Sequence, residues 1–364
     1  MKTVYVNGKF LAQRATGVQR SAREWLHAVD ELLSEDSSPL ERWIVLHPPG
    51  VVAPAWRSIE ARPVGASGTM LHLWEQWTLP RAADDGLLLS LAGSAPWSAR
   101  AQIATLHDAA VWDCPTSYTG PFALWYRTLF RHLASGARRL LTVSEFSRSR
   151  LSHWLRRPAV DIGIVPNGAD HLRRVTGDEQ ALMRLGLAGC RYVLAVASDN
   201  PSKNLARLAL AVQQLEPALG IELVLVGDGN PRVFAKGEAP QGDRVRRLGP
   251  VGDPSLKALL QGALVLAAPS LYEGFGLPPL EAMDCGCPVI AGRAAALPEI
   301  CGDAVLYVDP LSATDIGGAV RRLCVDHVLR EELRARGLAR AGRFTWRHGA
   351  ELLLGQVRSV LPSS

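Results

Sequence analysis

The chain is 364 residues long, about half of them apolar, and it carries a formal net charge of +5. This length favours two domains over one, and the balance of apolar and charged residues is that of a globular protein in water. No segment reaches the roughly 18 uninterrupted apolar residues that a membrane span requires, and no nucleic-acid-binding motif accompanies the positive charge. We therefore expect neither a transmembrane helix nor a nucleic-acid partner.

The start of the chain and its cysteines both bear on where the protein works. Residues 3–6 form a short apolar run without the long apolar core and cleavage site of a signal peptide, so we expect a first strand and a cytoplasmic protein. No CxxC pair occurs, and no cluster of histidines or further cysteines completes a zinc site. We predict buried free thiols for Cys114, Cys190, Cys285, Cys287, Cys301 and Cys324.

Short apolar runs alternate with longer amphipathic segments, a pattern that predicts parallel sheets with crossover helices. In the first half we expect strands at Thr3–Val6, Trp43–Leu46, Leu87–Leu91, Gln102–Leu106, Arg139–Val143 and Asp161–Val165. In the second half we expect them at Tyr192–Ala197, Glu222–Val226, Arg244–Leu248, Leu264–Ala268, Pro288–Ala291 and Ala304–Val308. The sequence thus predicts two doubly wound sheets, with a polar linker at Asp170–Gly189 and a final amphipathic helix at Gly349–Leu361.

Two candidate site residues follow strands or precede helices in the first half. In open parallel sheets, ligands bind beyond the carboxyl ends of the strands. Gly17 lies near the start of the helix expected at Ser21–Leu33, where a glycine lets a ligand approach the backbone closely. His107 follows the strand at Gln102–Leu106 and is placed to meet a cleft. A simple turn glycine and a hydrogen-bonded structural histidine are the alternatives.

A lysine follows the first strand of the second half. The loop from Val196 to Asn204 contains Ser198 and projects Lys203 beyond the strand end. A lysine ammonium is a compact donor to a phosphate oxygen, so this loop is a candidate binding site for a phosphorylated ligand. The alternative is a solvated loop lysine.

The strongest signal is the stretch from Ser270 to Met283. An apolar strand runs into a glycine-rich turn, and a helix is expected to start near Pro278, where a proline is tolerated. The amides of Gly274, Phe275, Gly276 and Leu277, together with the helix N-terminus, are expected to form an anion site. Carboxylates at Glu273 and Glu281 suit hydrogen bonds to vicinal hydroxyls, as in a ribose or a hexose. The alternative is a capping glutamate followed by a solvated one.

The stretch from Glu273 to Glu281, which reads EGFGLPPLE, resembles the signature of the retaining GT-B glycosyltransferases of family 4. The resemblance extends over nearly the whole chain. It implies that Glu273 contacts the transferred sugar near its anomeric carbon and that Glu281 contacts the ribose of the nucleotide. Lys203 matches the phosphate lysine of the family, although Ser198 and its neighbour Ala197 depart from the usual pattern and Ser202 replaces an arginine.

The resemblance also implies a fold and a domain layout. It implies that Gly17 touches the donor phosphates or the acceptor and that His107 lies close to the transferred sugar. The GT-B fold consists of two Rossmann-like, doubly wound parallel-sheet domains with an interdomain cleft. We expect an acceptor-side domain at residues 1–172, a nucleotide-sugar domain at residues 173–345, and a C-terminal helix at residues 346–364 that returns to the first domain.

The implied function is the retaining transfer of a hexose, mannose-like as the best guess, from a nucleotide-sugar donor. The acceptor would be a saccharide or a lipid-linked saccharide in bacterial polysaccharide or O-antigen assembly. No Asp-x-Asp pair occurs in the sequence to hold a divalent metal on the diphosphate, so we expect no metal and no cofactor beyond the nucleotide-sugar co-substrate. Lys203 and the amides of residues 274–277 would then neutralise the leaving group.

The basic segment at residues 147–157 has two interpretations. It could make a peripheral contact with an anionic membrane surface, at the inner face of the cytoplasmic membrane. The alternative, which the Leu and Trp spacing favours, is a surface helix with its apolar side in the core.

Three other functions stay open on the sequence alone. A nucleotide-sugar epimerase shares the fold, but the pair Glu273 and Glu281 argues against it. A Rossmann oxidoreductase requires a GxGxxG turn, which is missing between Val6 and Gly17. A non-catalytic nucleotide-sugar binder is excluded only by an activity assay.

Overall fold

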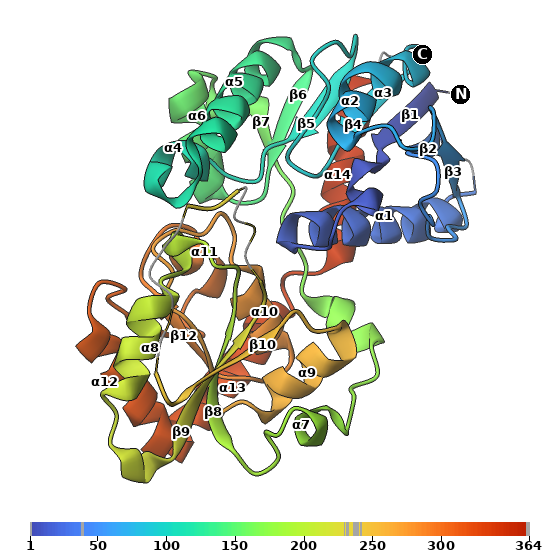
Figure 1. The fold of residues 1–364 in the computed structure, drawn as a ribbon. Coiled ribbons are helices and arrows are strands. Elements are labelled where there is room, and N and C mark those ends of the chain that lie inside the picture. The colour runs from blue at the N-terminus through green and yellow to red at the C-terminus, as the bar shows by residue number, and fades with distance from the viewer. Residues whose placement is uncertain are drawn as a thin grey trace. The chain divides into compact units, whose positions relative to one another are not determined.

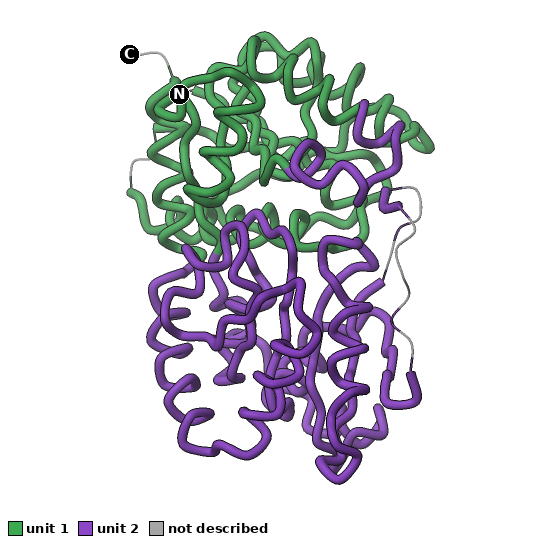
Figure 2. The backbone as a smooth tube through the Cα atoms, turned by 90° about the vertical axis from the view of Figure 1, so that its left-hand side faces the viewer, with its two compact units in different colours: residues 1–109, 125–167, 346–364 green, residues 110–124, 168–345 purple. Residues whose placement is uncertain are grey.

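The computed structural model describes residues 2–37, 40–228, 230, 233–235, 240 and 242–361. Contacts between Cα atoms divide the chain into two compact units, shown in green and purple in Figure 2. Unit 1 comprises residues 1–109, 125–167 and 346–364, and unit 2 comprises residues 110–124 and 168–345. Each unit is built around its own parallel sheet.

The sheet of unit 1 has the strand order β3-β2-β1-β4-β5-β6-β7, and its neighbouring strands are parallel. The order reverses between β1 and β4. The carboxyl ends of these two strands are therefore the switch point at which doubly wound sheets bind ligands. The strands are β1 (Lys2–Asn7), β2 (Glu41–His47), β3 (Ile59–Pro63), β4 (Leu87–Ser90), β5 (Gln102–Thr105), β6 (Arg139–Thr142) and β7 (Ile162–Ile164).

Helices α1 (Gly17–Glu35) and α14 (Trp346–Val360) pack side by side in unit 1, although they come from opposite ends of the chain (Figure 1). The packing is close because Gly349 has no side chain. A Cβ atom there would lie 2.9 Å from Nε1 of Trp25 in α1. The other described helical elements of unit 1 are η1 (Gly8–Ala12), α2 (Leu71–Leu73), the π-helical turn η2 (Trp74–Thr78), α3 (Leu79–Ala82), α6 (Glu145–Leu155), η4 (Ala159–Asp161) and most of α5 (Gly120–Gly136).

The sheet of unit 2 has the strand order β10-β9-β8-β11-β12-β13, again with parallel neighbours. Here the order reverses between β8 and β11, which places the switch point at their carboxyl ends. The strands are β8 (Arg191–Val196), β9 (Ile221–Val226), β10 (Val245–Gly249), β11 (Val265–Ala268), β12 (Val289–Gly292) and β13 (Leu306–Val308).

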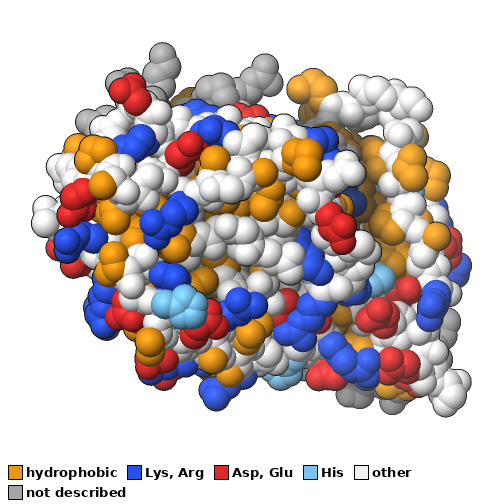
Figure 3. All heavy atoms as spheres, turned by 90° about the horizontal axis from the view of Figure 1, so that it is seen from below, with side chains coloured by type: hydrophobic (Ala, Val, Ile, Leu, Met, Phe, Trp, Pro, Cys, Tyr) orange, Lys and Arg blue, Asp and Glu red, His pale blue; other side chains and the backbone are white. Residues whose placement is uncertain are grey.

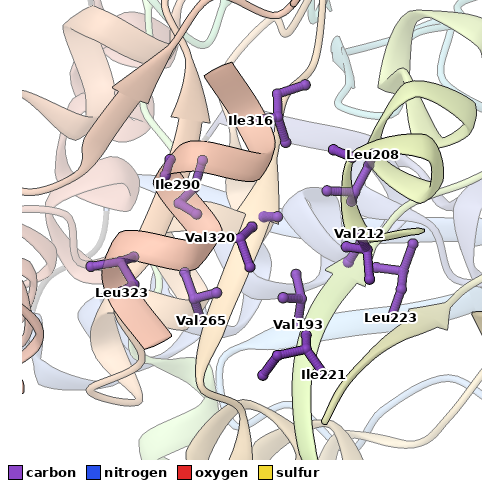
Figure 4. Close-up of a cluster of buried hydrophobic side chains, with 14 of the residues drawn as sticks. Val193, Leu208, Val212, Ile221, Leu223, Val265, Ile290, Ile316, Val320 and Leu323 are labelled. Atoms are coloured by element: carbon purple, nitrogen blue, oxygen red, sulfur yellow. The ribbon is translucent and has the colours of Figure 1, made fainter. Parts of the chain in front are cut away.

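A core of aliphatic side chains holds α8 and α12 against this sheet (Figure 4). Val193 and Leu223 come from neighbouring strands, Val212 from α8 and Val320 from α12, and all four are completely buried. Burying a valine or leucine side chain stabilises the fold by roughly 1.5–3 kcal/mol. The described helices of unit 2 include α7 (Ala181–Arg184), α8 (Leu205–Gln213), α9 (Asp253–Gly262), α10 (Leu277–Asp284), α11 (Leu297–Cys301), α12 (Ala313–Val325) and α13 (His327–Ala341), together with α4 (Ala110–Asp113).

Charged side chains of both signs are interspersed on the face drawn in Figure 3. Many arginines are paired within the protein, as Arg246 is with Glu222 and Arg321 with Glu216, each at 2.9 Å. Among the described helices, we find none with both the length and the apolar character needed to cross a bilayer.

The twelve predicted strands are all present, within two residues at each end, and the doubly wound class is confirmed. Strand β3 is the described strand that the sequence analysis missed. Its sequence, IEARP, is short, is only partly buried and lies at the sheet edge, so it lacks a buried apolar run. The stretch predicted as a linker, Asp170–Gly189, was misread, because it is a folded part of unit 2 that contains the 3₁₀ helix η5 (Asp170–Arg174) and α7.

The six cysteines are free, as predicted. Cys287, Cys301 and Cys324 are buried, and the other three are partly exposed. Burial raises the pKa of Cys285, Cys287 and Cys301 to about 12. These thiols therefore stay protonated at neutral pH, which suits a packing role rather than a nucleophile or a metal ligand.

Helix α6 begins with a side-chain cap. The Ser144 side chain accepts from the Ser147 amide at 3.1 Å, a typical N-cap. Leu151 is fully buried and Trp154 is half-buried. Arg157 donates to the Ala134 carbonyl at 2.7 Å, so this arginine ties α6 to the end of α5. A membrane role for residues 147–157 remains a prediction.

Candidate functional site

The switch point of unit 2 brings two predicted site residues together. The loop after β8 carries Lys203, and the loop after β11 carries Ser270 and Glu273. These three side chains line one narrow hollow, which is completed by Ala195, Val196, Ala197, Leu205, Leu266, Ala267, Ala268, Pro278 and Pro279. The hollow lies where a doubly wound sheet binds its ligand.

Lys203 and Glu273 form a bidentate ion pair. The Lys203 Nζ atom donates to both carboxylate oxygens of Glu273 at 2.7 Å. Ser270 Oγ adds a hydrogen bond to Glu273 Oε1 at 2.9 Å. The side chain of Lys203 is 22% exposed and that of Glu273 is 10% exposed. A partly exposed ammonium and a largely buried carboxylate therefore line the same hollow.

The two loops are fastened to each other through their backbones. Asn204 adopts the left-handed conformation, with φ of 62°, and its side-chain amide donates to the carbonyls of Pro269 and Pro310 at 2.9 and 2.6 Å. The Leu271 amide donates to the Ser202 carbonyl at 2.8 Å. Ser202, which stands where the resembling family has an arginine, is buried and supplies a backbone contact. The backbone segments that carry Lys203 and Glu273 are consequently fixed relative to each other.

The glycine-rich turn leads directly into α10. Gly276 is the N-cap residue with φ of 104°, and a Cβ there would lie 2.8 Å from a Leu297 methyl group. Only glycine fits this backbone and this contact. Gly274, Phe275 and Leu277 are all buried, so their amides lie beneath the surface of the turn. Whether they bind an anion stays a prediction.

Glu281 lies in α10 and is 3% exposed. Its Oε1 atom is 3.1 Å from Nε2 of His171, a residue of η5 that is 2% exposed. Sequence reasoning missed His171, because it lies among the polar residues that were interpreted as a linker. At this distance the two side chains form an ion pair when the imidazole is protonated.

Two further predicted site residues lie in unit 1. Gly17 is the first residue of α1, is exposed, and has open space where a Cβ would be. His107 stacks on Trp25, with ring centroids 5.9 Å apart, and its Nε2 atom lies 2.9 Å from the Leu91 carbonyl oxygen. A carbonyl only accepts, so Nε2 carries the proton. Burial lowers the pKa of His107 to about 4, so the ring is neutral at physiological pH.

Lys203, Glu273 and Glu281 therefore belong to unit 2, as does the half-buried Ser198 that follows β8, whereas Gly17 and His107 belong to unit 1. Within the residues that the structure describes, no three His, Cys, Asp or Glu side chains converge as they would around a metal ion. The charged group beside Glu273 is instead the Lys203 ammonium, which is suited to a phosphate oxygen.

Part of the chain matches a known protein family. Residues 190–326 match the family described as "Glycosyl transferases group 1". The matched segment includes the Lys203 loop, Glu273 and Glu281.

Similar curated proteins carry related names. Over 253 residues, the chain is 33% identical to O-antigen chain mannosyltransferase B of Escherichia coli, covering 67% of this chain and 66% of that protein. Over 244 residues, it is 32% identical to D-inositol 3-phosphate glycosyltransferase of Actinosynnema mirum, covering 62% of this chain and 58% of that protein. The chain thus spans less than two thirds of the length of each relative, 66% of the first and 58% of the second.

Solved structures with the same fold cover the whole chain. Sucrose-phosphate synthase from Thermosynechococcus elongatus superposes with a TM-score of 0.74 at 20% identity, covering 99% of this chain and 98% of that one. WaaG, a glycosyltransferase involved in lipopolysaccharide biosynthesis, gives a TM-score of 0.70 at 14% identity, covering 99% and 100%. At these identities the likeness shows the fold, which is the GT-B arrangement of two parallel-sheet domains.

Proposed function

This chain belongs to the group 1 glycosyl transferases through its domain at residues 190–326, and from that premise we propose that it transfers a hexose from a nucleotide sugar with retention of configuration. The acceptor that we propose is a saccharide or a lipid-linked saccharide of bacterial polysaccharide assembly. The relative named O-antigen chain mannosyltransferase B supports mannose as the transferred sugar.

The observation that carries this proposal is the cluster of Lys203, Glu273 and Ser270 at the switch point of unit 2. In sugar transfer from a nucleotide donor, negative charge grows on the diphosphate while positive charge grows at the anomeric carbon. An ammonium and a carboxylate 2.7 Å apart provide one group for each of these charges. Charges that are fixed before the reaction stabilise a transition state most effectively.

We assign the roles accordingly. Lys203 leaves Glu273 to contact the diphosphate, together with the amides of residues 274–277. Glu273 then faces the sugar and stabilises the oxocarbenium-like centre, without a covalent intermediate being assigned to it. Glu281, which lies beside His171 on the buried side of α10, contacts the ribose. His107, neutral and held by Leu91, positions the sugar or its reacting face, with Gly17 at the start of α1 on the same unit.

The test is direct. The protein is incubated with GDP-mannose, UDP-glucose and dTDP-glucose in turn, with methyl α-D-mannoside or methyl α-D-glucoside as acceptor probe. Release of the nucleoside diphosphate is measured, and the anomeric configuration of the product is read by proton NMR. We expect GDP-mannose to be used and an α-linked product to form.

Each alternative gives a different result. Conversion of one nucleotide sugar into another without transfer would identify an epimerase and overturn the proposal. Binding of a nucleotide sugar, seen as a raised melting temperature, without turnover in any combination would identify a binding protein. A β-linked product from an α-linked donor would show inversion and overturn the proposed retention.

A further inference from the structure

A segment from the first half of the chain is built into unit 2. Residues 110–124 group with residues 168–345 by their contacts, and Figure 2 draws both in purple. The segment begins with helix α4, whose first three residues are buried. It is therefore packed as part of unit 2, although the sequence on either side of it belongs to unit 1.

Backbone and aromatic contacts hold the middle of this segment. The Thr119 amide donates to the Val233 carbonyl at 2.9 Å, next to an antiparallel bridge between Tyr118 and Phe234. The ring centroids of Tyr118 and Phe234 are 5.8 Å apart, and Tyr118 also stacks on Phe122 at 5.5 Å. Aromatic pairs at such separations add to the stabilisation that comes from burial alone. The segment is thus fastened to unit 2 at several points.

The first part of the segment reaches the loop that carries Glu273. Tyr272 Oη donates to Asp113 Oδ2 at 3.1 Å. Asp113 is the last residue of α4, and Tyr272, which is 7% exposed, directly precedes Glu273 in the chain. A hydroxyl that donates to a carboxylate makes a stronger hydrogen bond than one between two neutral groups. Asp113 therefore holds the side chain of the residue next to Glu273.

The backbone around Tyr272 is bonded on both sides. The Leu271 amide donates to the Ser202 carbonyl at 2.8 Å, and the Ala296 amide donates to the Glu273 carbonyl at 3.2 Å. Tyr272 lies between these two bonds, and its bond to Asp113 fixes the direction of its ring. Because neighbouring residues share one backbone, a rotation of Tyr272 changes the direction in which the Glu273 side chain leaves it.

We propose that Asp113 is a positioning residue for the sugar transfer, and that it sets the direction of the Glu273 carboxylate through Tyr272. The inference rests on the proposed function, in which Glu273 faces the sugar. It also makes residues 110–124 part of the nucleotide-sugar site, although they precede residue 173, where we expected that domain to begin.

The bond is removed from each side in turn by Asp113→Ala and Tyr272→Phe. With GDP-mannose and methyl α-D-mannoside as probes, each variant should lower kcat about tenfold, because a misdirected carboxylate stabilises the transition state less well. The dissociation constant of free GDP, which lacks the sugar, should stay unchanged. The double variant should be no slower than either single variant, because both changes remove the same bond. Losses that multiply in the double variant, or full kcat in either single variant, would overturn the positioning role.

Two controls separate position from charge and from stability. Asp113→Asn keeps an oxygen acceptor and should recover most of kcat. Tyr192→Phe removes the hydroxyl of another buried tyrosine of unit 2, which donates to the Leu259 carbonyl at 2.7 Å, and should lower the melting temperature but leave kcat unchanged. If Asp113→Asn is as slow as Asp113→Ala, or if Tyr192→Phe loses as much kcat as Tyr272→Phe, the proposal is wrong.

A readout without substrates separates this inference from the proposed function. Carbon-13 NMR of protein labelled at its glutamate carboxyl groups follows Glu273, whose resonance is assigned by its loss in Glu273→Gln. If the wild-type protein transfers no sugar, the proposed function fails. A Glu273 resonance that shifts in Asp113→Ala and Tyr272→Phe, but not in Asp113→Asn or Tyr192→Phe, still supports the positioning role. A resonance that stays in place in both Asp113→Ala and Tyr272→Phe overturns it.

Discussion

At the scale of single residues, the ion pair between Lys203 and Glu273 predicts how substitution of each residue changes kcat and nucleotide affinity. Glu273→Gln keeps the shape but removes the charge beside the anomeric carbon. We expect kcat to fall about 100-fold, the scale of losing one transition-state contact. The affinity for free nucleoside diphosphate should stay the same or rise, because a neutral glutamine restrains the Lys203 ammonium less. Steady-state kinetics and calorimetry measure the two effects.

Lys203→Ala tests the role of the other member of the ion pair. It removes the ammonium that we assign to the diphosphate, so both kcat and nucleotide affinity should fall. The opposite pattern, in which Glu273→Gln abolishes nucleotide binding but leaves the turnover of saturated enzyme intact, would reverse the roles of the two residues.

Glu281 should act on binding more than on chemistry. Glu281→Ala removes the carboxylate that we assign to the ribose. Loss of such charge-assisted hydrogen bonds, worth about 1.5–3 kcal/mol, should weaken nucleoside diphosphate binding accordingly. Calorimetry with GDP and with inorganic pyrophosphate separates the ribose from the phosphates. Because His171 would lose its buried partner, the melting temperature must be measured in parallel. Unchanged GDP affinity would assign Glu281 to the packing of α10 on η5.

The lowered pKa of His107 predicts how the free energy of unfolding depends on pH. Its pKa of about 4 in the folded protein lies below the value of about 6.5 for an unfolded histidine, so protonation favours unfolding. The stability it contributes is fully present above pH 6.5 and is lost as the pH falls toward 4, by up to about 3 kcal/mol. Thermal unfolding at pH 7.5 and 4.5 should show a smaller loss for His107→Asn than for wild type. Equal losses would mean that His107 is solvated.

At the scale of elements, buried strands were predictable and edges were not. β8 and β9 are runs of aliphatic residues covered on both faces, a pattern that sequence periodicity detects. β3 forms because β2 offers a free edge, a tertiary cause that no local pattern in IEARP records. The segment that begins at Asp170 was interpreted as a polar linker, because His171 and Leu172 are the only buried residues of η5.

Helix α6 ends in a strained residue, which gives an element-scale prediction. Arg156, at its C-cap, has φ of 52°, a conformation that costs an L-residue roughly 1–2 kcal/mol. Arg156→Gly should relieve this strain and raise the free energy of unfolding by up to about 1 kcal/mol. Chemical denaturation measures the change. Ser149→Gly, at an exposed position inside the same helix, is the control and should lower stability by about 0.5 kcal/mol.

At the scale of the whole molecule, the sequence indicated which residues follow strands but not how their side chains pair. The predictions placed Lys203 and Glu273 beyond β8 and β11, and the topology brings both to one switch point. Their direct ion pair, the part played by Ser270, and the hydrogen bond from Tyr272 to Asp113 depend on side-chain geometry between segments that are distant in sequence. Such contacts arise from the packing of the folded chain, which periodicity and motif spacing do not encode.

The last prediction concerns the whole reaction: transfer should proceed without a divalent metal. A metal ion on a diphosphate leaving group neutralises the charge that develops as the glycosidic bond breaks. In this chain the Lys203 ammonium lies at the switch point of unit 2, and in the proposed mechanism it contacts the diphosphate while Glu273 faces the sugar. Turnover should therefore survive dialysis and excess EDTA with little change in kcat. If EDTA abolishes turnover and magnesium or manganese restores it, a metal ion neutralises the diphosphate. The role that we assign to Lys203 would then be wrong.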